Sequence, residues 1–243
     1  MTPEQLSSMM ARYPFTPHAK APNRILTCPV RMKWPQLDVV KPHPKYPDSK
    51  PQAGATLIIP PSANLKPLED MCRAVASQHF GALLDKPVVI RQGGEEVQST
   101  VRKELAWPYR RQTKYAGKPG FTEDGAGYYI KANSLYLPRI LDHKRNVVLG
   151  TDPAIYAGIW VIALLELSGN PKDMAKARAD DAKRGVRATL VQLMKIADDE
   201  VLPDGSGDAD DAFAEIEVPA DMLASGGNAA ASALAAGNDV AWA

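Results

Sequence analysis

Prolines occur along almost the whole chain, and they restrict its fold more than any other feature. The chain has 21 prolines among 243 residues. A proline inside a helix removes a hydrogen bond and clashes with the preceding turn, so a helical bundle is excluded. Strand ends, strand edges and loops tolerate prolines. We therefore predict a mostly β fold, and an apolar content of 45% is enough for one domain with a sizeable core.

Apolar periodicity indicates the order of the elements. Alternating or continuous apolar runs predict strands over 24–34, 55–59, 128–137, 154–168 and 185–197. A helix is predicted over 65–80, where apolar residues recur at helical spacing after Asn64, the expected N-cap, and before Gly81. Residues 91–127 lack periodicity and are predicted to form long loops, while 170–184 is either a short solvated helix or a loop. This order favours a small, mostly antiparallel β-barrel with one packed helix over a parallel βαβ arrangement.

Charge is divided unequally along the chain. No lysine or arginine occurs after residue 203, whereas eight of the 28 acids do. Residues 1–203 therefore carry 29 bases against 20 acids, a net charge of +9, and the last forty residues carry −8. A basic body with an acidic arm is typical of a polyanion binder that masks its own groove, and nucleic acid is the commonest polyanion. A tail that only improves solubility is the alternative, which Trp242 disfavours.

These patterns divide the chain into three expected parts. Residues 1–23 are proline-rich and aperiodic, and are predicted to be a flexible leader; 24–203 form the folded domain, and 204–243 a disordered acidic tail. The first residues contain no apolar segment of the kind that forms the core of a signal peptide. The longest apolar run, 155–167, is too short to span a bilayer. We therefore expect a cytosolic protein.

Residues 102–121 combine six bases, four aromatics and one acid, with no apolar period that would bury the rings. Rings that stack on unpaired bases, interleaved with cations that contact phosphates, are what a single-stranded nucleic acid requires. An ordinary loop whose Trp107 and Tyr109 pack into the core is the alternative. Similar but weaker combinations occur on the first strand and after the long loop. The predicted DNA-binding residues are Arg31, Lys33, Trp34, Lys103, Trp107, Tyr109, Arg110, Arg111, Lys114, Tyr115, Lys118, Tyr129 and Lys131.

Signatures of other chemistry are sparse. Cys28 and Cys72 lie in apolar contexts without metal-ligand spacing, and are predicted to be reduced core residues. No phosphate-binding glycine loop, nucleophile elbow or zinc finger occurs in the sequence, so neither an enzyme nor a cofactor is expected. One alternative stays open, a Mg²⁺-dependent phage nuclease or resolvase. It would use the acid pairs Glu95-Glu96, Asp180-Asp181 and Asp198-Asp199. A structural or adaptor protein with a fortuitous basic face is another.

Four segments resemble the single-stranded DNA-binding proteins of tailed bacteriophages, which have an OB-fold. They are 54–60 (Gly-Ala-Thr-Leu-Ile-Ile-Pro), 129–134 (Tyr-Ile-Lys-Ala-Asn-Ser), 155–161 with its Tyr-x-Gly-x-Trp pattern, and 184–190 with Arg-Gly-Val-x-x-x-Leu. The resemblance covers about residues 24–203, and its last two segments are the most specific. It implies an OB-fold-like antiparallel β-barrel.

The resemblance also implies sequence-independent binding of single-stranded DNA in phage replication, recombination or repair, in the host cytoplasm. It further implies that the acidic tail contacts phage or host replication and recombination proteins. Family tails often end in an acidic-aromatic peptide; here Asp239 and Trp242 are the corresponding partner-binding candidates, although Trp242 is not terminal. A homodimer is compatible with the sequence, and no membrane contact is expected.

Overall fold

The computed structural model describes residues 2–42, 50–170 and 185–203. Residues Met1–Leu202 form one compact unit, which is mostly β. Its helices are α1 (Pro3–Arg12) and α2 (Lys66–Phe80), with short 3-10 turns η1 (Gly81–Asp85) and η2 (Gln112–Tyr115). Its strands are β1 (Thr16–Pro17), β2 (Arg24–Leu26), β3 (Val30–Lys41), β4 (Gln52–Ile59), β5 (Pro87–Gln92), β6 (Glu95–Thr100), β7 (Tyr109–Arg111), β8 (Tyr128–Ser134), β9 (Arg139–Leu141), β10 (Val147–Val148), β11 (Trp160–Asn170) and β12 (Gly185–Ala197).

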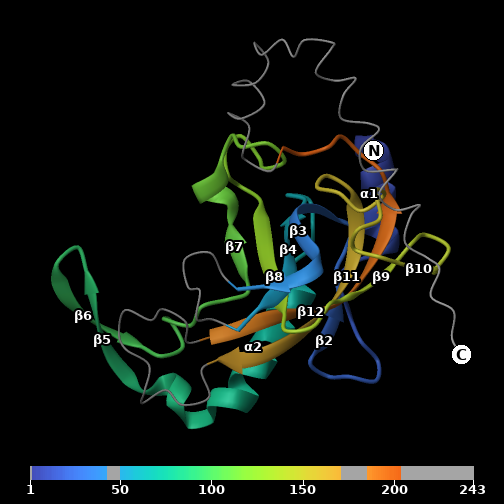
Figure 1. The fold of residues 1–243 in the computed structure, drawn as a ribbon. Coiled ribbons are helices and arrows are strands. Elements are labelled where there is room, and N and C mark those ends of the chain that lie inside the picture. Colours follow the sequence, from blue (N-terminus) through green and yellow to red (C-terminus); the bar gives the residue numbers. More distant parts are fainter. Residues whose placement is uncertain (1, 43–49, 171–184, 204–243) are drawn as a thin grey trace, which may run out of the picture. The chain divides into compact units, whose positions relative to one another are not determined.

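Five strands of the main sheet close into a barrel (Figure 1). Their hydrogen-bonded order is β3-β4-β8-β12-β11, and β11 pairs again with β3. The β8–β12 pair is parallel and the other four pairs are antiparallel. A five-stranded closed barrel of this kind has the architecture of an OB-fold. The predicted mostly β, OB-fold-like barrel with one main packed helix is confirmed, while the tail expected over 204–243 lies outside the described residues.

Alternation along the strands fills the barrel. Leu57 and Ile59 of β4, Ile130 of β8 and Leu165 of β11 are fully buried in the main core, while Ile58 and Tyr129 beside them belong to a second, smaller buried cluster. Helix α2 buries the stripe that its spacing predicts, Leu68, Met71, Cys72, Val75, Ala76 and Phe80. The backbone N–H of Lys66 donates to Asn64 Oδ1 (3.0 Å), but the N-cap is Leu65 and not Asn64, one residue later than expected. Both cysteines are free and buried, and burial raises their pKa to about 12.

The structure differs from the sequence-based expectation at several places. The strand predicted over 24–34 is two strands, β2 and β3, and the strand predicted over 128–137 ends at Ser134. The expected leader contains α1, which starts with a capping box between Thr2 and Gln5, and Phe15, which is buried in the core. The strand expected from 154 begins only at Trp160, because turns occupy 153–154 and 157–158, the second at Gly158, whose φ is +118°. Part of the predicted loop 91–127 forms the β5–β6 hairpin, a separate two-stranded sheet. The segment 171–184 lies outside the described residues.

A short segment, Asp198 to Leu202, fastens the end of β12 to the barrel, and we call it the C-terminal strap. The Trp160 indole N–H donates to Asp199, and the guanidinium of Arg31 donates to Glu200 O at 2.9 Å. Leu202 is 4% exposed and packs with Ile58, Phe121 and Tyr129. The hydrogen bond from Lys195 holds the pKa of Asp198 below its ordinary value. The strap therefore belongs to the folded unit.

Candidate nucleic-acid interface

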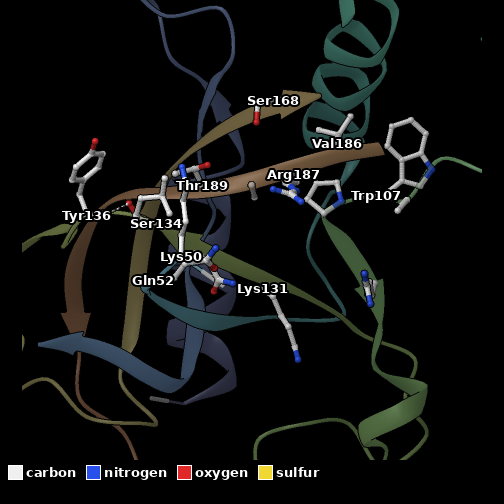
Figure 2. A pocket seen from close by; sticks show the side chains of 16 residues that line it. Lys50, Gln52, Trp107, Lys131, Ser134, Tyr136, Ser168, Val186, Arg187 and Thr189 are labelled. Atoms are coloured by element: carbon white, nitrogen blue, oxygen red, sulfur yellow. Dashed lines mark hydrogen bonds between the residues drawn. The ribbon is translucent and has the colours of Figure 1, made fainter. Parts of the chain in front are cut away.

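A groove of about 720 Å³ lies on the outside of the barrel, where β7, β8 and the start of β12 meet (Figure 2). Four of the residues that line it are basic, two are aromatic, and none is acidic. They are Lys50, Gln52, Ala106, Trp107, Pro108, Arg110, Lys131, Asn133, Ser134, Leu135, Tyr136, Ser168, Val186, Arg187, Ala188 and Thr189. The groove is therefore positively charged, with hydrogen-bonding groups between its cations.

Local backbone contacts set the shape of this groove. Gly185 forms a parallel bridge with Ala106, and the N–H of Val186 donates to Ala106 O at 2.9 Å. A Cβ at Gly185 would lie 1.9 Å from that same oxygen, so only glycine permits the contact. The bridge holds Trp107 beside β12. On the other side, β7 pairs with β8 so that Arg110 lies opposite Tyr129.

A buried glutamine fixes the loop that follows β7. Gln112 is 0% exposed, and its amide N–H donates to Tyr128 O at 2.8 Å. Its Oε1 accepts from the backbone N–H of Thr122 at 2.9 Å and from the Thr122 hydroxyl. Gly127 gives the amide room, because a Cβ there would lie 2.5 Å from Gln112 Nε2. The loop between β7 and β8 is thus held against the barrel by a polar side chain and not only by apolar packing.

Beside the groove, four aromatic rings pack against one another on the same side of β3, β4 and β8. Tyr115 lies 4.9 Å from Phe121 and 5.3 Å from Tyr129 between ring centroids, and Trp34 lies 5.5 Å from Tyr115. We call Trp34, Tyr115, Phe121 and Tyr129 the aromatic cluster. Lysines surround it: the ammonium groups of Lys114, Lys118 and Lys131 lie 5.8–6.0 Å from the Tyr115 ring.

A smaller hollow of about 220 Å³ joins the groove to the aromatic cluster. Trp34 and Lys41 line its far side, and Gln52, Lys131 and Asn133 line both hollows. We call the groove, the hollow and the aromatic cluster together the basic face. It covers the outer side of β4 and β8. In an OB-fold, the second and third barrel strands form the surface that binds oligonucleotides, and β4 and β8 are those strands here.

The structure divides the predicted site residues into three groups. Trp107, Arg110 and Lys131 line the groove. Trp34, Tyr115 and Tyr129 belong to the aromatic cluster, with Lys114 and Lys118 exposed at its edge. The remaining residues lie elsewhere or have structural partners, and they are Arg31, Lys33, Lys103, Tyr109 and Arg111.

Lys33 was predicted as a DNA-binding residue, but its side chain is buried inside the protein. Its side chain is 2% exposed, and its ammonium donates to Pro119 O and lies 5.0 Å from the Trp34 ring and 5.4 Å from the Phe121 ring. Lys33 does face outward from β3, but the segment that carries Pro119 and Phe121 covers that face. A buried cation with a carbonyl and two rings around it stabilises this covering segment.

Arg31, Tyr109 and Arg111 also have partners within the protein. Arg31 donates to Gly158 O and Glu200 O, so it holds the C-terminal strap. Tyr109 packs on the core cluster, and burial raises its pKa to about 12. Arg111 donates to Ala126 O at 3.0 Å and lies over the Tyr128 ring. Lys103 is exposed in the turn after β6, outside the groove lining.

Tyr136 and Arg187 line the groove but were not among the predicted site residues. The strand pattern of 185–197 already placed Arg187 opposite the core residues Val186 and Ala188, so its position could have been found. Tyr136 follows β8 in a loop, and no local pattern identified it. Asp239 and Trp242, the expected partner-binding residues, lie outside the described part of the chain.

The acids considered for a metal site have other contacts or cannot be described. Asp198 accepts from Lys195 and Asp199 from Trp160, both in the strap. Asp180 and Asp181 lie outside the described residues. Within the described ranges, no group of three or more His, Cys, Asp or Glu side chains could hold a metal ion. No helix in the described part is long and apolar enough to cross a membrane.

Comparison with known proteins identifies similar chains. Residues 23–223 match the family model described as the ssDNA-binding protein of Enterobacter phage Enc34. The solved structure of the single-stranded DNA-binding protein from bacteriophage Enc34 in complex with ssDNA is similar, with a TM-score of 0.56 and 19% identity over 78% of this chain and 98% of that one. A second structure of that phage protein gives a TM-score of 0.54 and 20% identity over 82% of this chain and 98% of that one. None of the curated protein sequences matches.

Proposed function

Because this chain belongs to the family of the Enterobacter phage Enc34 ssDNA-binding protein, we propose that it binds single-stranded DNA along the basic face, without regard to base sequence. The observation that carries this proposal is the groove with four basic and no acidic lining residues on the outside of β8 and β12. Lysines and arginines there meet phosphates, which occur at every nucleotide. Such contacts give affinity that does not depend on sequence.

The basic face suits an unpaired strand better than a duplex. A single strand presents base faces, and aromatic rings at the groove can stack on any of them, since every base has a π face. The groove lies directly on the barrel and offers, among the described elements, no helix that would enter a major groove. Binding of this kind serves replication, recombination or repair of phage DNA in the host cytoplasm, which is the role we propose.

The acidic tail is proposed to regulate the same site. Its eight acids carry the charge that phosphates carry, so they compete for the lysines and arginines of the basic face. Asp239 and Trp242 at its end are proposed to contact replication or recombination proteins. Displacement of the tail by DNA would then expose its end to those partners.

The experiment that tests the function is fluorescence anisotropy with a labelled single strand and with the matching duplex, at several salt concentrations. We expect the single strand to bind more tightly. Each phosphate contact contributes about 0.7 to the log–log salt slope on a single strand, so four contacts give a slope of about −2.8. Affinity that hardly changes with salt would contradict an electrostatic groove. Incubation of the same strand with Mg²⁺ should leave it intact; its cleavage would favour a nuclease.

A further inference from the structure

Tyr136 differs from every other aromatic side chain that the structure describes. It is 79% exposed, whereas the other phenylalanines, tryptophans and tyrosines that the structure describes are buried or half-buried. The rings of the aromatic cluster pack on one another, and Trp107 stacks on Tyr109 with centroids 6.5 Å apart. Among the described residues, none makes a ring or cation contact with Tyr136. Both faces of its ring are therefore available to a ligand.

The backbone that carries this ring is fixed, although the ring is exposed. The N–H of Tyr136 donates to the hydroxyl of Ser134 at 3.2 Å, and Ser134 is 9% exposed at the end of β8. Two residues later, Pro138 is buried, and β9 begins at Arg139. An exposed ring on a fixed backbone loses little conformational entropy when it binds, since only two side-chain torsions must be ordered.

The surroundings of Tyr136 indicate the chemistry of the ligand. In Figure 2, Tyr136 and Trp107 stand at opposite ends of the groove, with Lys50, Lys131 and Arg187 between them. A ligand that spans the groove must therefore offer a flat ring at one end and negative charge along its length. A single-stranded nucleic acid has both, with a base at each nucleotide and a phosphate between neighbouring nucleotides.

We propose that Tyr136 is a principal base-stacking residue of this protein, and that the strand crosses β8 and β12 between Tyr136 and Trp107 instead of following residues 102–121. This inference rests on the proposed function. It adds a residue that the sequence did not indicate, and of the densest basic-aromatic segment it keeps only the part with Trp107 and Arg110 on the path of the strand. Tyr109, Tyr115 and Tyr129 then serve to hold the basic face in shape, because their rings have partners inside the protein.

The exposed ring also has apolar neighbours, so a contact with another protein is the competing explanation. Leu135 and Leu137 on either side are 46% and 53% exposed. A protein contact would use their apolar surface, and leucine would serve at position 136 nearly as well as tyrosine. Base stacking requires a flat ring, so phenylalanine should replace tyrosine there and leucine should not. The two explanations therefore predict opposite results for Tyr136→Leu.

The first test compares Tyr136→Ala, Tyr136→Leu and Tyr136→Phe in the full chain, by anisotropy with a labelled oligo-dT strand. We expect the Ala and Leu variants to bind about 5- to 150-fold more weakly at an unchanged salt slope, and the Phe variant to bind within about twofold of the parent. Tyr13→Ala, at the end of α1 and outside the groove, is the control and should bind normally. Thermal melting should be the same for all Tyr136 variants, since the ring is exposed.

The second test is photochemical and does not depend on affinity. A strand with 5-iodouracil is crosslinked to the protein, which is then cleaved with trypsin. The peptide 132–139 contains Tyr136 as its single aromatic residue, whereas 104–110 contains Trp107 and Tyr109. We expect the crosslink in 132–139. Normal binding by Tyr136→Ala and Tyr136→Leu, together with no crosslink in the peptide 132–139, would overturn the inference. The proposed function would still stand in that case if Lys131→Gln weakens binding. A parent protein that binds no single strand would instead refute the proposed function.

Discussion

At the scale of single residues, two adjacent arginines of β7 have different roles. Arg110 lines the groove, whereas Arg111 donates to Ala126 O and lies 4.5 Å from the centroid of the Tyr128 ring. We expect Arg110→Gln to flatten the log–log salt slope by about 0.7, the contribution of one phosphate contact. Arg111→Gln is the matched control and should leave the slope unchanged. Salt titrations of both variants against one oligonucleotide check this, and equal slopes for the two variants would contradict the placement.

Gln112 offers a test of stability rather than of binding. Replacing it by leucine keeps the volume but removes the hydrogen bonds of the buried Gln112 amide with Tyr128 O and with the Thr122 N–H. We expect Gln112→Leu to lower the free energy of unfolding by about 1–3 kcal/mol. Urea unfolding monitored by tryptophan fluorescence measures it. Gln98→Leu on the exposed strand β6 is the control. A comparable loss of unfolding free energy in that variant would contradict a specific role of Gln112 in stability.

Lys33 shows what residue patterns can and cannot predict. Alternation along β3 correctly placed Lys33 on the side opposite Met32, because the side-chain period of a strand is local. That this side is covered by residues near Phe121, almost ninety positions later, depends on tertiary contacts that no local pattern records. The same limitation explains Tyr109 and Arg111. In contrast, Trp107, Arg110 and Lys131 were predicted and do line the groove.

At the scale of elements, the join between the loop before β7 and the start of β12 can be tested through Gly185. A methyl group there would lie 1.9 Å from Ala106 O, so the two segments must separate. We expect Gly185→Ala to lower stability by about 1–3 kcal/mol and also to weaken binding, since the bridge positions Trp107 and Arg187. Gly94→Ala, in the β5–β6 turn with φ +94° and no atom within 4 Å, is strained without a clash and should bind normally. Normal DNA binding by Gly185→Ala would show that the bridge does not shape the site.

The C-terminal strap is a second element whose contribution can be measured. Ending the chain after Ala197 removes Leu202 from its apolar cluster and the partners of Trp160 and Arg31. Burial of one leucine is worth about 1.5–3 kcal/mol, so this truncation should melt at a clearly lower temperature. Ending the chain after Pro203 keeps the strap and should melt like the full chain. Scanning calorimetry of the two truncations separates them.

Which elements the sequence predicts depends on how each one is buried. Helix α2 and strand β12 bury one face in the core, so their periodicity identifies them, and β4 is buried on both faces, so its continuous apolar run identifies it. The β5–β6 hairpin has no such signal, because it forms its own two-stranded sheet and most of β6 is exposed. Helix α1 has no buried residue, so no apolar stripe marks it in the sequence. Its local signal is the capping box formed by Thr2 and Gln5. Elements that lie on the barrel without contributing to its core were therefore missed.

At the scale of the whole molecule, the division of charge into +9 and −8 gives a prediction about regulation. An unstructured chain of forty residues has an r.m.s. reach of about 35 Å, and a 200-residue domain has a radius of gyration of about 16 Å. A tail of this kind would reach the basic face, as proposed above. Ending the chain after Pro203 should raise the affinity for single strands, mainly at low salt. At physiological salt the Debye length is about 8 Å, so the attraction between the acids of the tail and the basic face is screened. A truncation that binds no better at low salt would rule out masking.

The order in which the strands pair along the chain has a consequence for how the protein is made. Arg24 of β2 lies opposite Glu166 of β11, and β11 pairs along its length with β12, the last strand of the barrel. At about 5–20 residues per second, a ribosome needs roughly 7–28 seconds to add the residues between Arg24 and Glu166. Strand β2 therefore lacks its β11 partner during this time, while β3 and β4 can already pair. Folding dominated by such distant contacts is slow, so we expect the nascent chain to be most prone to aggregation just before β11 emerges.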